Sequence, residues 1–185
     1  MTHEILIAGF GGQGILSMGM TLSYAGMIEG KEVSWMPSYG PEMRGGTANC
    51  IVIISDRKIS SPIISKFDVV IAMNQPSVQK FENSVKPGGF FIYDSTKVIE
   101  PPARTDISVI PVPASAEAVT LGNTRVANMI VLGTVLGTTD PVSVEAVLGA
   151  LKKVLPERYH HMLPLNERAL RRGMQVATGS VAAEL

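Results

Sequence analysis

The feature that most constrains this chain is the segment Gly9-Phe10-Gly11-Gly12-Gln13-Gly14, which directly follows the apolar run Ile5-Leu6-Ile7-Ala8. An apolar strand, a glycine-rich turn and a helix in this order present backbone N–H groups to an anionic ligand in α/β domains. Glycine suits such a turn because a Cβ atom would crowd a phosphate that approaches the main chain. The sequence therefore predicts a turn that accepts an anion. The alternative is a turn that only packs a helix on a sheet.

Apolar strand-like runs and helix-like segments alternate along the rest of the chain. We expect strands at residues 5–8, 32–36, 47–55, 67–73, 90–93 and 107–112, and helices at 15–29, 75–85, 114–121, 124–136, 142–155 and 165–177. Gly30 should close the first helix, and Pro37 should stop the second strand. We also expect a turn at 55–58, a short paired strand at 59–60, and a helix-ending turn at 86–89.

This alternation is typical of an α/β fold with a mostly parallel sheet. We expect a single Rossmann-like, three-layer domain with helices on both faces of the sheet and with room for one antiparallel hairpin. We assign residues 1–178 to this domain, and residues 179–185 to a frayed tail.

Composition narrows the classes of partner. The chain has 16 basic and 16 acidic residues, so its net charge is zero, and binding to nucleic acid is not expected. No secretory signal and no long apolar run is present, so we expect a cytoplasmic protein without membrane contact. Charged residues make up 17% of the chain, below the usual share of about 25%. This favours either a surface covered by a partner or an unusually complete core.

Nicotinamide binding is one alternative for the first glycine segment. A dinucleotide site places an Asp or Glu at the end of the second strand, where it holds the ribose hydroxyls. Here that strand ends in Val33-Ser34-Trp35-Met36-Pro37, which offers no acid and no arginine for a 2′-phosphate. A stand-alone NAD(P)-binding oxidoreductase is therefore disfavoured, but it stays open. A non-catalytic interaction module, whose glycines serve only packing, is the other alternative.

A second shaped loop, Ser38-Tyr39-Gly40-Pro41-Glu42-Met43-Arg44-Gly45-Gly46, follows the second strand. It should lie at the carboxyl edge of the sheet, where open α/β sheets bind ligands. Arg44 is suited to clamp a carboxylate or phosphate with two hydrogen bonds. The alternative is an ion pair between Glu42 and Arg44. Asn74 and Asp94 end two further strands at the same edge and are weaker site candidates.

Several other residues have ordinary structural interpretations. Cys50 lies within an apolar strand, so we expect a buried, inert thiol. As the only cysteine, it excludes an internal disulfide or an iron–sulfur cluster held by this chain alone. His160 and His161 have no third ligand at a suitable spacing, so no metal site is expected. Asn123 should cap a helix, with an anion contact by the Asn123-Thr124-Arg125 segment as the alternative. A solvent-exposed or subunit-facing stripe is expected of Arg168, Arg171 and Arg172.

Together, the two glycine segments resemble the gamma subunit of 2-oxoacid:ferredoxin oxidoreductases. The resemblance continues through Thr47-Ala48-Asn49-Cys50, Phe67-Asp68-Val69-Val70-Ile71-Ala72-Met73-Asn74 and Gly122-Asn123-Thr124-Arg125-Val126-Ala127-Asn128. It thus covers most of the chain.

The resemblance implies a multi-subunit enzyme that oxidatively decarboxylates a 2-oxoacid, forms an acyl-coenzyme A and reduces ferredoxin. In that family thiamine diphosphate and its Mg lie between alpha and beta subunits, and iron–sulfur clusters lie on beta or delta parts. This chain has no Gly-Asp-Gly segment for the thiamine cofactor. We therefore expect an accessory subunit that binds no cofactor alone, is inactive alone, and assembles with alpha, beta and in some complexes delta partners.

The resemblance also suggests a role for the two loops in closing over coenzyme A. We expect no catalytic or metal-binding residue, and we assign cofactor contacts to Gly9, Gly11, Gly12, Gln13, Gly14, Tyr39, Glu42, Arg44, Gly45 and Asn74. The Pro-Glu-Met-Arg-Gly-Gly motif is more similar to 2-oxoglutarate or branched-chain enzymes than to the pyruvate version, which tends to carry Arg-Arg-Gly-Ala. Of these, 2-oxoglutarate is the expected substrate. Indolepyruvate enzymes, which have a related small subunit, stay open.

Overall fold

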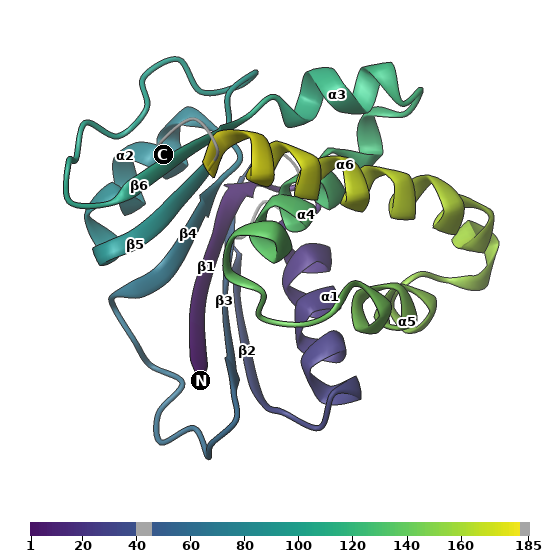
Figure 1. Ribbon diagram of the computed structural model, residues 1–185, viewed down its shortest axis with the longest axis horizontal. Helices are drawn as coiled ribbons and strands as arrows, with labels where there is room; N and C mark the ends of the chain where they lie inside the picture. Colours follow the sequence, from purple (N-terminus) through teal and green to yellow (C-terminus); the bar gives the residue numbers. More distant parts are fainter. Residues whose placement is uncertain (40–45, 182–185) are drawn as a thin grey trace.

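Six strands form one mixed sheet in the computed structural model, which describes residues 1–39 and 46–181 (Figure 1). The strands lie in the order β2-β3-β1-β4-β5-β6. Their bounds are β1 Thr2–Phe10, β2 Glu32–Tyr39, β3 Thr47–Ser55, β4 Phe67–Ala72, β5 Val85–Asp94 and β6 Ser108–Val112. Strands β1, β4, β5 and β6 pair in parallel, whereas β3 is antiparallel to both β1 and β2. The predicted α/β fold with an antiparallel hairpin is confirmed.

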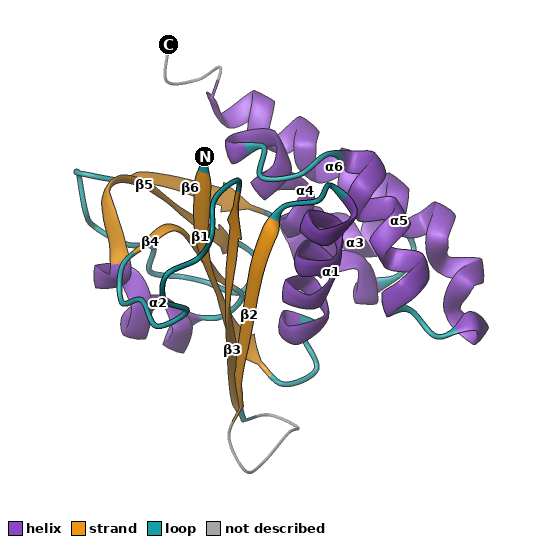
Figure 2. Cartoon of the chain, turned by 90° about the horizontal axis from the view of Figure 1, so that it is seen from below, coloured by secondary structure: helices purple, strands orange, loops and turns teal. Residues whose placement is uncertain are grey.

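The helices cover the two faces of the sheet unequally. Figure 2 shows α1, α4, α5 and α6 on one side of the sheet and α2 on the other. Their bounds are α1 Ile15–Ile28, α2 Gln75–Phe81, α3 Ala114–Thr120, α4 Ala127–Thr139, α5 Val144–Val154 and α6 Leu163–Val181. Short 3₁₀ turns occupy Glu82–Ser84, Thr124–Val126 and Glu157–Met162. Among these helices, none is both long and apolar enough to cross a membrane.

Strand β1 lies inside the sheet and is buried on both faces. Ile5 and Ile7 belong to the core beneath α1 and α4, whereas Leu6 belongs to a second core that includes Val78 of α2. A strand that is covered on both faces consists of consecutive apolar residues, without the alternation of apolar and polar residues seen in a half-exposed strand. For this reason residues 5–8 could be predicted as a buried strand.

Gly30 ends α1 as the sequence predicts. Its φ of 71° is left-handed, and its N–H donates to the carbonyl of Met27 over 3.1 Å while the N–H of Lys31 donates to that of Gly26 over 3.0 Å. These two bonds satisfy carbonyl groups that the helix end would otherwise leave unpaired.

Helices α4 and α6 approach each other through glycine. A Cβ atom at Gly133 would lie 1.9 Å from the carbonyl oxygen of Leu170, and one at Gly173 would lie 1.8 Å from that of Ile130. Backbone-to-backbone contact of this kind excludes any side chain at either position. The Thr134 hydroxyl joins the two helices further by donating to the carbonyl of Gly173 over 3.1 Å.

One predicted strand boundary and one predicted short strand are wrong. Pro37 does not stop the second strand, because β2 runs through it to Tyr39. Strand β2 is an edge of the sheet, where a residue without an N–H breaks no ladder on its outer side. No strand forms at Ile59 and Ser60, which lie in an irregular connection between β3 and β4.

The turn predicted at residues 86–89 is also wrong, because these residues belong to β5. The register against β4 shifts between Phe67 and Val69, so that β5 accommodates extra residues opposite that step. Gly88, with φ of 76°, lies within this irregular stretch. The preceding helix is correspondingly shorter than predicted and ends at Phe81 before a 3₁₀ turn.

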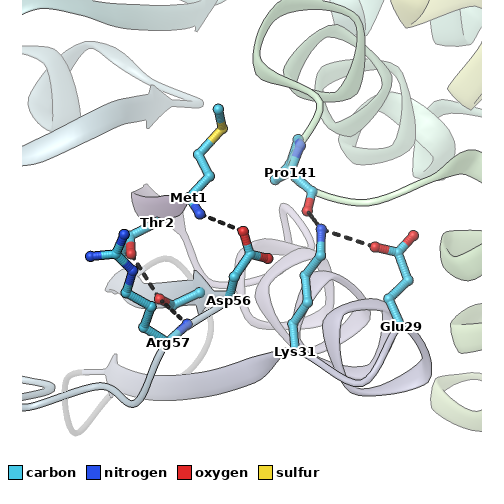
Figure 3. A network of polar contacts seen from close by, with 8 residues as sticks. Met1, Thr2, Glu29, Lys31, Asp56, Arg57 and Pro141 are labelled. Atoms are coloured by element: carbon cyan, nitrogen blue, oxygen red, sulfur yellow. Dashed lines mark hydrogen bonds and ion pairs between the residues drawn. The ribbon is translucent and has the colours of Figure 1, made fainter.

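Polar contacts fix the amino-terminal edge of the sheet, opposite the glycine segment (Figure 3). The Met1 amino group pairs with Asp56, and Lys31 pairs with Glu29 over 3.0 Å and donates to the carbonyl of Pro141 over 2.8 Å. The first contact joins the start of β1 to the turn after β3, and the Lys31 contacts join the end of α1 to the connection between α4 and α5. The loops that carry the candidate site lie at the opposite, carboxyl edge of the sheet.

Candidate functional site

The first glycine segment forms the turn between β1 and α1 at the carboxyl edge of the parallel strands. Gly14 precedes the first residue of α1 with a left-handed φ of 77° and offers no side-chain cap. The first helical bond runs from the N–H of Met18 to the carbonyl of Gly14. Within residues 1–39 and 46–181, the N–H groups of Ile15, Leu16 and Ser17 have no protein acceptor. They are therefore available to an anion at the helix start.

Two glycines in this turn are required by their neighbours. A Cβ atom at Gly9 would lie 2.7 Å from Gln13 Oε1 and 3.0 Å from Met73 Cβ, and one at Gly14 would lie 2.4 Å from Asn128 Nδ2. Packing therefore explains these two positions without a ligand. Gly12 differs, because its φ is 97° but a Cβ there would meet nothing within 4 Å.

The side chains of Gln13 and Asn74 hold the turn in shape. Gln13 Oε1 accepts a hydrogen bond from the N–H of Phe10 over 2.6 Å, and Gln13 Nε2 donates to the carbonyl of Met73 over 2.9 Å. Asn74 donates to Gln13 Oε1 over 3.3 Å and caps α2 by accepting from the N–H of Ser77 over 2.9 Å. The structure therefore brings both predicted residues to the turn, where their amide groups serve protein contacts.

A cavity of about 560 Å³ lies beside the turn at the carboxyl edge of the sheet. Gly12, Gln13 and Gly14 form one wall. Two cationic residues, Lys97 and Arg125, also line the cavity. Further polar lining comes from Thr96, Ser115, Thr124 and Asn128.

The charge of this cavity favours anionic ligands. Lys97 follows β5, Arg125 lies just before α4, and both are exposed. In the described part of the chain, neither side chain has a carboxylate within ion-pair distance. Two cations without a protein counter-ion, together with unpaired N–H groups, form a site suited to phosphate or carboxylate.

Asp94 is fully buried behind this cavity and acts as a structural residue. Its Oδ1 accepts from the N–H of Thr96 over 3.0 Å, and its Oδ2 accepts from the Ser115 hydroxyl over 2.5 Å. These bonds join the loop after β5 to the start of α3, and so fix the loop that carries Lys97.

Two smaller cavities meet the same turn. One of about 260 Å³ lies between α1 and β3 and has a mainly apolar lining that includes Phe10, Leu16 and Ala48. The other, of about 370 Å³, lies between the start of α4 and the turn before α6, and its lining includes Arg125 and Tyr159. Gly14 borders all three cavities, so the three cavities meet at the glycine turn.

The two glycine segments lie next to each other. The N–H of Gly11 donates to the carbonyl of Gly46, the last residue of the second segment, over 2.9 Å. The backbone of Tyr39 ends β2, but its side chain is not described. The other predicted residues of that loop, Glu42, Arg44 and Gly45, lie outside the described residues.

The remaining candidates have structural roles. Cys50 is fully buried, which confirms the predicted burial, and burial raises the pKa of its thiol to about 12. The Asn123 side chain caps the 3₁₀ turn by accepting from the N–H of Arg125 over 3.0 Å, which confirms the predicted cap. A ring nitrogen of His160 lies 2.9 Å from the carbonyl of Leu155. The predicted exposure is confirmed for Arg168, Arg171 and Arg172, of which the last two pair with Glu167 and Glu117.

Sequence reasoning missed Lys97 and Ser115 and gave Arg125 only a secondary role. The signal for Lys97 was available, because it follows Asp94-Ser95-Thr96 at the end of a strand that belongs to the same edge. Arg125 lies just before α4, and Ser115 lies in the first turn of α3. Both residues reach the cavity only because tertiary packing places these helices beside the glycine turn.

Comparison with known proteins identifies a family and several relatives. The family described as pyruvate ferredoxin/flavodoxin oxidoreductase matches residues 4–176. The chain is 39% identical over 184 residues to ketoisovalerate oxidoreductase subunit VorA of Methanothermobacter thermautotrophicus, covering 98% of this chain and 38% of that protein. It is 37% identical over 163 residues to 2-oxoglutarate synthase subunit KorC of Methanothermobacter marburgensis, covering 84% of this chain and 88% of that one. The family predicted from the two glycine segments is confirmed.

Solved structures agree with the fold. The gamma subunit of a keto/oxoacid ferredoxin oxidoreductase from Geobacter sulfurreducens matches with a TM-score of 0.80 and 30% identity over 96% of this chain and 99% of that chain. The 2-oxoglutarate:ferredoxin oxidoreductase of Magnetococcus marinus, with 2-oxoglutarate, coenzyme A and succinyl-CoA bound, matches with a TM-score of 0.87 and 27% identity. That match covers 96% of this chain but 31% of the Magnetococcus chain. The chain thus spans about a third of the length of the VorA protein and of the Magnetococcus chain.

Proposed function

Because this chain belongs to the pyruvate ferredoxin/flavodoxin oxidoreductase family as a gamma-type subunit, we propose that it is an accessory subunit of a 2-oxoacid:ferredoxin oxidoreductase. The complex would convert a 2-oxoacid and coenzyme A to an acyl-coenzyme A and carbon dioxide, with transfer of two electrons to ferredoxin. This chain would help to shape and cover the site where coenzyme A binds.

One observation carries the proposal beyond family membership. The glycine turn, with its unpaired N–H groups at the start of α1, borders a cavity that Lys97 and Arg125 also line. Coenzyme A carries a diphosphate and a further phosphate, and these groups match such donors in charge. The chemistry of the donor set therefore fits this ligand.

Each part of the site has a distinct task in this proposal. The N–H groups at the start of α1 would bind phosphate oxygens without the cost of ordering a side chain. Lys97 and Arg125 would supply compensating charge, and Arg125 is also able to form two parallel hydrogen bonds with one phosphate. Asp94 and Gln13 would keep the two loops at fixed positions.

The cofactors that perform the redox steps would belong to other subunits. Thiamine diphosphate, with its Mg, would supply a carbanion that attacks the oxo group, and iron–sulfur clusters would pass electrons to ferredoxin. The chain has a single cysteine and no Gly-Asp-Gly segment. Within the described residues, no three side chains of the His, Cys, Asp or Glu type gather as metal ligands. We therefore assign these cofactors to alpha and beta partners, with a delta partner in some complexes.

We propose 2-oxoglutarate as the oxoacid, in line with the Pro41–Gly46 motif and the similarity to 2-oxoglutarate synthase subunits. A branched-chain oxoacid is the second candidate, since the ketoisovalerate subunit matches nearly the whole chain at 39% identity. Steady-state assay of the assembled complex with each acid separates the two. A kcat/KM for 2-oxoisovalerate above that for 2-oxoglutarate would reverse our assignment.

The coenzyme A role is tested in the assembled complex by titration with coenzyme A at saturating oxoacid. We expect Lys97→Ala and Arg125→Ala each to raise the KM for coenzyme A by about 10-fold, equivalent to roughly 1.4 kcal/mol, and to leave the KM for the oxoacid unchanged. Arg168→Ala removes an exposed arginine of α6 that lines none of the three cavities, and it is the matched control. Wild-type KM values for coenzyme A in both variants would remove these residues from the site.

Arg44 is tested separately, on the basis of its sequence motif. Arg44→Ala in the complex should weaken coenzyme A binding if the second loop closes over the ligand. Unchanged affinity and turnover would exclude Arg44 and leave the role to the glycine turn. Micromolar nicotinamide binding to the isolated chain would instead favour the stand-alone oxidoreductase.

A further inference from the structure

The cavity of about 370 Å³ near the start of α4 adjoins the anion-suited cavity. Its lining comes from the start of α4, the end of α5 and the start of α6, three helices on the same side of the sheet (Figure 2). Gly14, Arg125 and Asn128 line both cavities. A ligand whose anionic part lies at the glycine turn is therefore able to extend into this second space, which we call the α4–α6 cavity.

Asn128 is the lining residue that most needs an explanation. It is only 8% exposed, and its side chain has no hydrogen-bond partner within residues 1–39 and 46–181. Buried amides are normally paired, because an unpaired one loses its bonds to water without replacement. Among the described residues, Trp35 Nε1 is the one side-chain polar atom that is both sealed from solvent and unpaired. The Asn128 amide is therefore open to the cavities that it lines.

Packing fixes the Asn128 amide at the junction of the two cavities. A Cβ atom at Gly14 would lie 2.4 Å from Asn128 Nδ2 and 2.9 Å from its Cγ, so the amide lies directly against the glycine turn. Asn128 belongs to the first turn of α4, a helix that packs on α6 through backbone contact at Gly133 and Gly173. An unpaired amide that is held in place by well-packed helices is typical of a ligand contact.

Asn166 offers a second amide to the α4–α6 cavity. It too is 8% exposed. Its Nδ2 donates to the carbonyl of Met162 over 3.1 Å, whereas its Oδ1 has no donor in the described part of the chain. Much of the remaining lining is apolar or aromatic, from Val126, Met129, Leu151, Leu155, Tyr159 and Met162.

This combination suits the base of an adenine nucleotide. Adenine carries an amino donor beside a ring-nitrogen acceptor, and one asparagine amide is able to pair with both. The free Oδ1 of Asn166 is an additional acceptor for such an amino group. The faces of the base are apolar and stack on aromatic side chains such as Tyr159. A base joined to phosphates over a short distance requires an apolar cavity with a few amides next to a cationic one.

We propose that the α4–α6 cavity binds the adenine base of a nucleotide whose phosphates lie at the glycine turn, and that Asn128 and Asn166 contact this base. The inference deepens the proposed coenzyme A role and rests on it for the identity of the ligand, since coenzyme A contains adenine as well as phosphates. A free adenine nucleotide has the same chemistry, so the experiment includes both sources.

Calorimetric titration of the assembled complex without oxoacid tests the proposal by binding alone. Adenosine 3′,5′-bisphosphate supplies the base without the pantetheine arm, and 4′-phosphopantetheine supplies the arm without the base. We expect Asn128→Leu and Asn166→Leu each to weaken binding of the bisphosphate by about 10-fold and to change the affinity for 4′-phosphopantetheine by less than about twofold. Asn83→Leu, at an exposed position outside these cavities, is the matched control.

Thermal unfolding separates a ligand contact from a structural role. Because the Asn128 amide has no partner among the described residues, Asn128→Leu should leave the melting temperature unchanged or raise it while the affinity for the bisphosphate falls. If the leucine is not accommodated, Asn128→Ala provides the same titration. Unchanged affinity for the bisphosphate in the folded Asn128 and Asn166 variants would overturn the proposal. An equal loss for 4′-phosphopantetheine would also overturn it, because the cavity would then hold the arm.

Titrations with coenzyme A and with adenosine monophosphate distinguish failure of this proposal from failure of the proposed function. Weaker binding of both in the Asn128 and Asn166 variants supports the base site and the coenzyme A role together. A loss for adenosine monophosphate alone, with coenzyme A affinity unchanged in these variants and in Lys97→Ala and Arg125→Ala, would retain the base site for a free nucleotide and remove the coenzyme A role. A loss of coenzyme A affinity in Lys97→Ala and Arg125→Ala only would retain that role and overturn the base site.

Discussion

At the scale of single residues, Gly14 is the position at which backbone and packing constraints coincide. Its φ is 77°, and a Cβ atom would lie 2.4 Å from Asn128 Nδ2. We predict that Gly14→Ala lowers the free energy of unfolding by about 2–4 kcal/mol, from backbone strain and overpacking together. Gly12→Ala is the control, because φ is 97° there but the space is open, and it should cost only about 1–2 kcal/mol. Equal losses in denaturant titrations would contradict this assignment.

Cys50 yields a prediction about pH. Burial raises the pKa of its thiol from 9.0 to about 12, so between these values the folded chain retains a proton that the unfolded chain releases. Stability should therefore fall as pH rises above 9, by up to about 1.4 kcal/mol per pH unit, and Cys50→Ser or Cys50→Ala should flatten that dependence. In the native state at pH 8 the thiol should not react with a disulfide reagent, and it should react fully after unfolding. Rapid native-state labelling would contradict the buried thiol.

At the scale of elements, the contact between α4 and α6 depends on glycine. A Cβ atom at Gly173 would lie 1.8 Å from the carbonyl oxygen of Ile130, a backbone atom that cannot rotate away. We predict that Gly173→Ala lowers the free energy of unfolding by about 3 kcal/mol or more. Gly179→Ala on the same helix meets nothing within 4 Å, so its gain in helix propensity should make it neutral or stabilising by up to about 1 kcal/mol. Comparable melting temperatures for the two variants would show that the helices can separate at little cost.

The success of sequence reasoning also varied by element. The buried strands and most of the helices were predictable, because an apolar run such as residues 5–8 has one simple explanation in an α/β chain. The predictions at Pro37 and at residues 86–89 were wrong, because proline is tolerated at a sheet edge and glycine at a register shift. The sequence alone shows neither the edge nor the shift. For the site, the glycine turn was found from local spacing. Lys97, Ser115 and Arg125 meet only through the packing of three separate elements around one edge.

At the scale of the whole molecule, we propose a chain that contributes binding surfaces and leaves the redox chemistry to other subunits. Its anion-suited edge is assembled from the glycine turn, the loop after β5 and the start of α4. Helix α1 leaves Tyr24, Met27 and Ile28 exposed. In two larger relatives the segment similar to this chain is one part of a longer polypeptide.

Reconstitution tests this claim most directly. The purified chain is assayed for coenzyme A-dependent reduction of ferredoxin with 2-oxoglutarate and with 2-oxoisovalerate, alone and after addition of the alpha and beta subunits. We predict no turnover and no cofactor absorbance for the chain alone, and activity in the mixture that is lost when this chain is omitted. Oxoacid decarboxylation by the chain alone, or full activity of the partners without it, would contradict the account.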